Sequence, residues 1–200
     1  MVIKNSNKPI LIIGFTNSTL TQEIYEAFLD YTDEKDFGVI TPDDFVALPS
    51  KKNYQYIIGF ALELDLRKKI IDIIDTNDLN CISYIHDNCY ISSNATIGQG
   101  VFMGPFSSVC KNAVIEDHVC IETYCLISHY SVIGTNTIIR SGTKIAGRTV
   151  IGRNCTLGFN SAVLNSLTVT DNVHLGAYSN LAKSADKPGN YVGSSARKIS

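Results

Sequence analysis

The central stretch of the chain repeats every six residues: residues 115–138 divide into IEDHVC, IETYCL, ISHYSV and IGTNTI, each beginning with isoleucine. The same spacing continues in both directions, so that every sixth position from Ile85 to Leu181 carries an aliphatic side chain or methionine. A period of six fits neither an α-helix, which repeats about every 3.6 residues, nor a lone strand, which repeats every two. It is typical of hexapeptide repeats, in which three six-residue sides form one triangular coil of a parallel β-helix.

A second series of mostly small side chains lies four residues after the first. Its members are Cys89, Ala95, Val101, Ser107, Ala113, Val119, Cys125, Ser131, Thr137, Thr143, Thr149, Cys155 and Ser161. We expect the aliphatic residue of each repeat to point into the prism and the small residue to fit the tight corner. Residues eighteen apart should then lie above one another, with coils stacked at about 4.8 Å. The repeats predict about five and a half coils, wound left-handed as in other hexapeptide proteins, against the right-handed rule for parallel crossovers.

The first part of the chain has a different pattern, in which apolar strands alternate with amphipathic helices. Strand-like runs occupy 9–15, 37–40 and 54–61, and helical spacing of apolar residues occupies 21–31 and 64–74. This alternation favours a parallel sheet with helices packed on it. We therefore predict a small Rossmann-like α/β domain over residues 1–82, followed by a left-handed parallel β-helix over residues 83–200 that includes a C-terminal tail.

Charge and composition point to small molecules or further copies of the chain as partners. With 17 basic and 19 acidic residues, a net charge of −2 and no long run of one sign, the chain lacks the usual footprint for nucleic acid or an anionic membrane. Its longest early apolar run, residues 10–15, is too short for a signal-peptide core or a membrane span, so we expect a cytoplasmic protein. The six cysteines form no CxxC pair, which favours reduced thiols.

Of the four histidines, His129 is the candidate for chemistry. It lies two positions after the inward Ile127 and should face outward from a flat side of the prism. Gly147, eighteen residues later, should lie one coil above it, where a glycine leaves room for an extended ligand to approach the backbone. A zinc site of the γ-class carbonic anhydrase kind is the alternative on this fold. It requires three converging histidines, and neither His118 nor His174 shares the column of His129.

The chain resembles the sialic acid O-acetyltransferase-like family of hexapeptide acyltransferases, and within it the UDP-bacillosamine N-acetyltransferase type. The resemblance covers nearly the whole chain and includes the Ile-Ser-His element at 127–129. It is carried by segments 10–14, 57–59, 66–70, 100–105, 127–129, 132–134, 144–147, 151–155, 157–161, 192–193 and 196–197. The combination of the α/β domain, the repeats and the Ile-x-His element is more specific than the repeats alone.

This resemblance implies an acetyl-CoA-dependent acetyltransferase that acts on a nucleotide-linked amino sugar for surface glycan biosynthesis, with transfer to nitrogen favoured over transfer to oxygen. It implies that His129 is the general base, which takes a proton from the acceptor as the acceptor attacks the thioester. Imidazole suits this role because its ordinary pKa lies near neutral pH. It also implies a homotrimer whose active sites lie between subunits.

The resemblance assigns binding residues as well. The co-substrate acetyl-CoA is expected to lie along the prism and to contact Gly147, Phe159, Ala177 and Ile138. The nucleotide of the acceptor is expected in the N-terminal domain, at Gly14, Thr16, Asn17, Ser18 and Gly59. No metal is expected.

Three positions depart from the family pattern. The residue after the base is commonly acidic, but here it is Tyr130, and a second histidine nine residues after the base is here Ile138. The glycine-rich turn after the first strand keeps only its first glycine, Gly14. The departures leave open a transferase for another acyl group or for a non-nucleotide sugar. They also leave open a catalytically degenerate trimeric scaffold or sugar-binding module.

Overall fold

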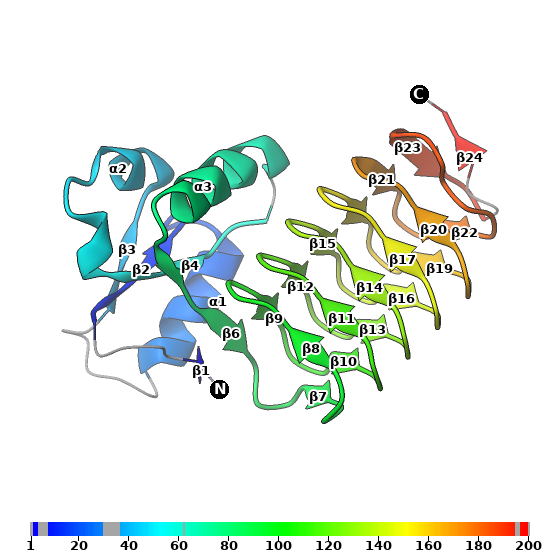
Figure 1. Cartoon of the computed structure of the whole chain (residues 1–200), viewed down its shortest axis with the longest axis horizontal. Helices are drawn as coiled ribbons and strands as arrows, with labels where there is room; N and C mark the ends of the chain where they lie inside the picture. Colours follow the sequence, from blue (N-terminus) through cyan, green and yellow to red (C-terminus); the bar gives the residue numbers. More distant parts are fainter. Residues whose placement is uncertain (1, 4–7, 30–36, 62, 195–196, 200) are drawn as a thin grey trace. The chain divides into compact units, whose positions relative to one another are not determined.

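The structure is a computed structural model that describes residues 2–3, 8–29, 37–61, 63–194 and 197–199. The chain divides into two compact units, Val2–Tyr84 and Ile85–Ser200 (Figure 1). The first is an α/β unit, and the second is a parallel β-helix.

The described residues of the α/β unit form a four-stranded parallel sheet, as the alternation of strands and helices predicts. Its strands are β2 (Ile10–Ile13), β3 (Phe37–Ile40), β4 (Gln55–Ile58) and β5 (Asn80–Cys81), in the order β3-β2-β4-β5. Its helices are α1 (Thr19–Leu29), α2 (Pro42–Ala47), the 3-10 helix η2 (Lys51–Asn53) and α3 (Leu64–Thr76). β1 (Val2–Ile3) pairs antiparallel with β6 (Ser83–Ile85).

The core of this unit joins the sheet to two helices. Ile13 and Ile58 pack in one cluster with Phe45 of α2 and Ile70 of α3, and all four are at most 2% exposed. Helix α2 was not predicted, because six residues are too few to show helical periodicity. The helix predicted over 21–31 begins two residues earlier, at Thr19, and its predicted end lies outside the described residues.

The β-helix is made of short strands, and successive strands belong in turn to three sheets. Its strands are β7 (Tyr90–Ile91), β8 (Thr96–Ile97), β9 (Phe102–Met103), β10 (Ser108–Val109), β11 (Val114–Ile115), β12 (Cys120–Ile121), β13 (Leu126–Ile127), β14 (Val132–Ile133), β15 (Ile138–Ile139), β16 (Lys144–Ile145), β17 (Val150–Ile151), β18 (Thr156–Leu157), β19 (Ala162–Val163), β20 (Thr168–Val169), β21 (Val173–Leu175), β22 (Asn180–Leu181), β23 (Gly189–Val192) and β24 (Arg197–Lys198). We name each sheet after the first of these strands that it contains. The β7 sheet has the order β22-β19-β16-β13-β10-β7, the β8 sheet has the order β20-β17-β14-β11-β8, and the β9 sheet contains β9-β12-β15-β18-β21-β23-β24.

One coil takes eighteen residues, as the hexapeptide period predicts. Ile127 pairs in register with Val109 on one side and with Ile145 on the other. The resulting coils are stacked in Figure 1 from green to orange. Every residue of the aliphatic series from Met103 to Leu181 is at most 2% exposed, which confirms the predicted inward positions. Each such side chain stabilises the fold by roughly 1.5–3 kcal/mol when fully buried.

A four-residue turn separates consecutive strands and forms the corners of the coil. The first corner follows strands of the β7 sheet, the second follows the β8 sheet and the third follows the β9 sheet; in one coil they are residues 128–131, 134–137 and 140–143. The small series is buried at the fourth residue of these turns from Val101 to Ser161, as predicted. From the turn 98–101 to the turn 176–179, the third residue of the turn has a positive φ: Gly100, Phe106, Asn112, His118, Tyr124, Tyr130, Asn136, Gly142, Arg148, Asn154, Asn160, Ser166, Asn172 and Tyr178. For side chains other than glycine this conformation costs about 1–2 kcal/mol, so packing of the coils imposes it.

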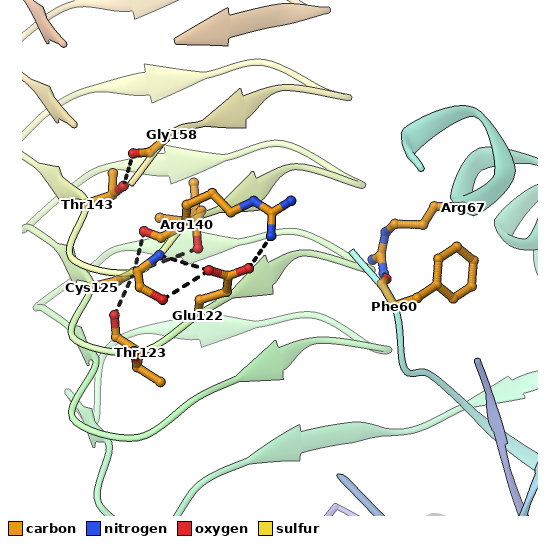
Figure 2. A network of polar contacts seen from close by, with 10 residues as sticks. Phe60, Arg67, Glu122, Thr123, Cys125, Arg140, Thr143 and Gly158 are labelled. Atoms are coloured by element: carbon orange, nitrogen blue, oxygen red, sulfur yellow. Dashed lines mark hydrogen bonds and ion pairs between the residues drawn. The ribbon is translucent and has the colours of Figure 1, made fainter. Parts of the chain in front are cut away.

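Polar side chains at the corners connect successive coils (Figure 2). Thr143 Oγ1 donates to the Gly158 carbonyl at 2.9 Å. Glu122 accepts a hydrogen bond from Arg140 Nη1 at 2.6 Å, and its other oxygen accepts from the backbone N–H and the hydroxyl of Ser141, both at 3.0 Å. These bonds satisfy backbone groups that a tight turn leaves without a strand partner.

The last coil is closed by an antiparallel addition to the β9 sheet. β23 pairs parallel with β21, and β24 then pairs antiparallel with β23. Tyr191 of β23 is 6% exposed, belongs to the prism core and donates its hydroxyl to the Lys187 carbonyl at 2.9 Å. The C-terminal segment therefore covers the end of the apolar column.

Candidate active site on the corners of the prism

His129 lies in the first corner, in the turn between β13 and β14, with its side chain exposed. The prediction that it faces outward is confirmed. The prediction that it lies on a flat side is wrong, because β13 has only two residues and the second residue after Ile127 already belongs to the turn.

Gly147 occupies the equivalent place in the turn one coil further along, and it is buried. A methyl group on its α carbon would lie 2.5 Å from Cε1, 2.7 Å from Nε2 and 2.9 Å from Nδ1 of His129. These distances are shorter than a non-bonded contact of about 3.5–4.0 Å. The space that the glycine leaves is therefore filled by the imidazole ring itself, where the sequence led us to expect a ligand.

Two further side chains lie near His129. The ring of Tyr130 meets the imidazole edge-on, with centroids 5.7 Å apart and planes at 83°. The guanidinium carbon of Arg148 lies 5.5 Å from the centroid of the Tyr130 ring, and the Arg148 backbone N–H donates to the His129 carbonyl at 2.9 Å. Sequence reasoning missed Arg148, whose only signal was its position eighteen residues after Tyr130.

The other predicted acetyl-CoA contacts lie elsewhere in the chain. Phe159 and Ala177 are exposed residues of the third corner in consecutive coils, and the guanidinium carbon of Arg140 lies 5.6 Å from the Phe159 ring centroid. Ile138 lies in β15, paired with Cys120 and Thr156, and is only 1% exposed. Within one chain, the structure brings Gly147 to His129 but does not bring Phe159, Ala177 or Ile138 to it.

The predicted nucleotide residues divide into packing residues and loop residues. Gly14 and Gly59 are both buried against Thr21, whose hydroxyl donates to the Gly59 carbonyl at 2.7 Å and accepts from the Phe15 N–H at 3.2 Å. Thr16, Asn17 and Ser18 form the loop from β2 to α1. Glycine is thus needed at 14 for close packing of the sheet on α1, and at 59 for close packing against Ile12 of the neighbouring strand, whose Cγ2 would lie 2.8 Å from an added methyl group.

A pocket of about 520 Å³ opens beside this loop. It is lined by Thr16, Thr21, Gln22, Tyr25, Glu26, Phe37, Gly38 and Val39. Of the predicted nucleotide residues only Thr16 reaches it. The pocket residues that come from α1, at positions 22, 25 and 26, share one helix face at spacings of three and four. This spacing is a sequence signal that could have identified them.

The histidines do not converge on a metal site. His118 is buried in the second corner and His174 lies in β21, paired with Thr156, whereas His129 is in the first corner. Among the residues that the structure describes, no three His, Cys, Asp or Glu side chains are grouped to hold a metal ion. No helix in the described part of the chain has the length and apolarity needed to cross a membrane.

The buried cysteines of the small series are structural thiols. Cys125 Sγ donates to the Arg140 carbonyl at 3.2 Å, and Cys155 Sγ donates to the Thr170 carbonyl at 3.3 Å. Burial raises the pKa of Cys125 to about 12 and that of Cys155 to about 11. Neither thiol is a nucleophile at neutral pH, since the thiolate is the reactive form.

Comparison with known proteins supports the same fold. The family model of the GMPPB C-terminal domain matches residues 84–177. The acetyltransferase domain of PglB from Neisseria gonorrhoeae, solved in complex with acetyl coenzyme A, is similar at 20% identity, with a TM-score of 0.83 over 97% of this chain and 100% of that one. PerB from Caulobacter crescentus, solved with CoA and GDP-perosamine, has 16% identity and a TM-score of 0.82 over 98% and 99%.

WeeI from Acinetobacter baumannii is similar in the same way, with 18% identity and a TM-score of 0.84 over 96% of this chain and 100% of that one. At these identities the likeness concerns the fold. The chain, over nearly its whole length, therefore has the fold of the PglB acetyltransferase domain and of PerB, as the resemblance in its sequence predicted.

Proposed function

We propose that the protein is an acetyl-CoA-dependent acetyltransferase that acts on a nucleotide-linked amino sugar, for surface glycan biosynthesis, and that acetylates nitrogen in preference to oxygen. The observation that carries this proposal is an exposed histidine, His129, seated on a corner of a hexapeptide β-helix whose fold matches a domain solved with acetyl coenzyme A. PerB, of the same fold, was solved with CoA and the nucleotide sugar GDP-perosamine.

His129 acts as the general base in this proposal. Its imidazole takes a proton from the acceptor amine while the amine attacks the thioester carbonyl, and the CoA thiolate leaves and is then protonated. The side chain is exposed and can reach a bound acceptor. General bases contribute about 10²- to 10⁴-fold to the rate of such steps.

The active site is completed by a second copy of the chain. His129 and Gly147 lie in the first corner, whereas Phe159 and Ala177 lie in the third, at the opposite end of the β7-sheet strands. In a homotrimer the first corner of one subunit packs beside the third corner of the next, so that acetyl-CoA contacts both. Ile138, which is buried and on neither of these corners, is retained as a cofactor contact only on the ground of resemblance.

The exposed apolar side chains favour this packing. Within residues 63–194, which the structure describes without a gap, each large apolar side chain exposed at a corner belongs to the first or third corner: Phe106, Tyr124, Tyr130, Phe159, Leu164 and Tyr178. The second corner carries polar residues such as Asp117, Asn136 and Asp171. Exposed apolar patches of this kind mark interaction surfaces.

The α/β unit holds the nucleotide of the acceptor in this proposal. Its pocket of about 520 Å³ is of the size that small-molecule sites have, about 300–1,000 Å³. Thr16 lines the pocket, and Asn17 and Ser18 continue the same loop, while Gly14 lies against Thr21 and Gly59 against Ile12 and Thr21.

Several structural expectations belong to the same proposal. The β-helix winds left-handed, and the α/β unit is Rossmann-like, with residues 1–82 as the acceptor-binding domain and residues 83–200 as the acyltransferase domain. We place the protein in the cytoplasm, where its cysteines stay reduced. All six are free thiols in the structure.

A thiol-release assay with acetyl-CoA, against a panel of UDP-, dTDP- and GDP-linked amino sugars, tests the activity. We expect turnover with at least one of these sugars and an acetyl group on nitrogen by mass spectrometry. Turnover only with another acyl-CoA or with a free sugar would replace the substrate assignment. Absence of any turnover and of acetyl-CoA binding would favour a trimeric scaffold or sugar-binding module.

Mixed trimers test the intersubunit site. Subunits with His129→Ala are combined with subunits carrying Phe159→Ala, so that a site with an intact first corner and an intact third corner arises only between unlike chains. Random mixing restores about a quarter of the sites in a closed ring. Mixing His129→Ala with His129→Gln is the control and restores none. If the first mixture gains nothing over its two parents, the site lies within one chain.

A further inference from the structure

The His129 imidazole is held without a hydrogen bond or ion pair from any residue that the structure describes. A histidine that serves as a base is usually oriented by a hydrogen bond to its second ring nitrogen. In this chain the contacts that remain are packing contacts with Gly147 and Tyr130. Within the chain, these packing contacts are what orients the ring.

Gly147 forms the floor beneath the ring. A methyl group at this position would lie within 2.9 Å of Cε1, Nε2 and Nδ1 of His129 alike, so the face of the ring near Cε1 lies over the glycine α carbon. The backbone itself does not require glycine, because Gly147 is absent from the described glycines of positive φ, unlike Gly142 at +78°. Glycine is therefore needed at 147 because any side chain there would collide with the ring of His129.

Tyr130 and Arg148 form the wall beside the ring. Tyr130 presents its ring to the imidazole at 83°, the edge-to-face geometry that aromatic pairs prefer. Arg148 lies over the Tyr130 ring at 5.5 Å and also donates its backbone N–H to the His129 carbonyl. Tyr130 is 48% exposed, and its ring contacts the Arg148 guanidinium on one side and the His129 imidazole on another.

We propose that Gly147, Tyr130 and Arg148 are positioning residues that hold the His129 imidazole in one orientation by packing, with Arg148 acting through Tyr130. This inference rests on the proposed function for its kinetic consequence, but the geometry stands apart from it. Gly147 then has a role in the turnover step besides the acetyl-CoA contact that resemblance assigned to it.

Gly147→Ala is the sharpest kinetic test, because it adds one methyl group beneath the ring. A displacement of a catalytic group by about 1 Å can cost about 100-fold in rate. We expect kcat to fall by this order with the KM for acetyl-CoA unchanged, and we expect no further loss when Gly147→Ala is added to His129→Ala. A raised KM with unchanged kcat, or a further loss in the double variant, would overturn the inference.

Tyr130 offers a conservative pair of variants. Tyr130→Phe keeps the ring and should keep the rate, whereas Tyr130→Leu removes the edge contact and should lower kcat by about two- to tenfold. Arg148→Leu should give a similar loss, and the double variant Tyr130→Leu with Arg148→Leu no more than Tyr130→Leu alone. Losses that multiply would show that Arg148 does not act through Tyr130.

Histidine-selective ¹³C NMR tests the geometry without activity. In the whole protein we expect contacts between the His129 Hε1 proton and the Gly147 α protons, and a shift of the His129 resonance in Tyr130→Leu but not in Tyr130→Phe. If no acceptor is ever turned over, these spectra still support the positioning while the proposed function fails. If the contacts are absent in an active enzyme, the positioning is overturned and the function stands.

Discussion

Glu122 and Arg140 form an ion pair across two successive coils, at the same position of the third corner, with Oε1 and Nη1 2.6 Å apart (Figure 2). Their side chains are only 17% and 15% exposed. The guanidinium also lies over Phe159 of the next coil. One partly buried carboxylate thus connects two coils through Arg140, and through its hydrogen bonds to Ser141.

We expect Glu122→Ala to lower the free energy of unfolding by about 1–3 kcal/mol, because a backbone N–H at Ser141 loses its acceptor. Glu116→Ala is the matched variant, since Glu116 accepts from the N–H and hydroxyl of Thr135 at 3.0 Å in the same register. The difference between the two variants in urea unfolding measures the ion pair to Arg140. Wild-type stability in both would show that the corner carboxylates do not stabilise the coil.

His129→Ala should remove the activity but not the fold. We expect a loss of about 10²- to 10⁴-fold in kcat/KM and a change in stability within about 0.5 kcal/mol, because the side chain is exposed. The measurements are the transfer assay, thermal unfolding and acetyl-CoA titration. Retention of more than about a tenth of the wild-type kcat/KM would remove His129 from the mechanism.

A charge inside the prism should unfold it, whereas the same charge outside should not. Ile151 is 1% exposed and its neighbour in β17, Val150, is 43% exposed. Ile151→Asp buries a carboxylate among aliphatic side chains at a cost of several kcal/mol, about 3–5 by analogy with unpaired buried charges. Val150→Asp on the same strand is the control and should fold normally. Equal melting temperatures in the two variants would show that the inward register is wrong.

The stability of the β-helix should fall as the pH rises above about 9. Cys125 and Cys155 keep their protons in the folded chain up to pKa values of about 12 and about 11, whereas in the unfolded chain they ionise near 9.0. Over the range between these values the unfolded chain binds fewer protons. The free energy of unfolding therefore falls by about 1.4 kcal/mol per pH unit for each thiol.

Below pH 8 both states hold these protons, so the thiols add no pH dependence there. The double variant Cys125→Ala with Cys155→Ala should lose this part of the slope in denaturant titrations between pH 8 and 11. Other alkaline groups contribute equally to both proteins and cancel in the comparison. A slope that is the same in the variant and the wild type would contradict the buried, protonated state of the thiols.

The sequence alone determined the β-helix and its register. A side chain that returns to the interior every six residues is a property of each strand and turn, and it can be read without knowing any distant contact. This period placed Gly147 one coil from His129 and put the aliphatic and small series inside. It could not show helix α2, whose six residues carry no period, nor the left-handed backbone at Tyr130, where the residue type disfavours that conformation.

Only the tertiary structure decided how the candidate site is made. That the His129 ring rests on Gly147 and that Arg148 covers Tyr130 both depend on contacts between coils eighteen residues apart. The same holds for Gly59, which packs against Ile12 and Thr21, and for the pocket, which is lined by residues of α1 and β3 together with Thr16. A local pattern specifies which face a residue is on, but the orientation of its side chain is set by what packs against it, and those neighbours are distant in sequence.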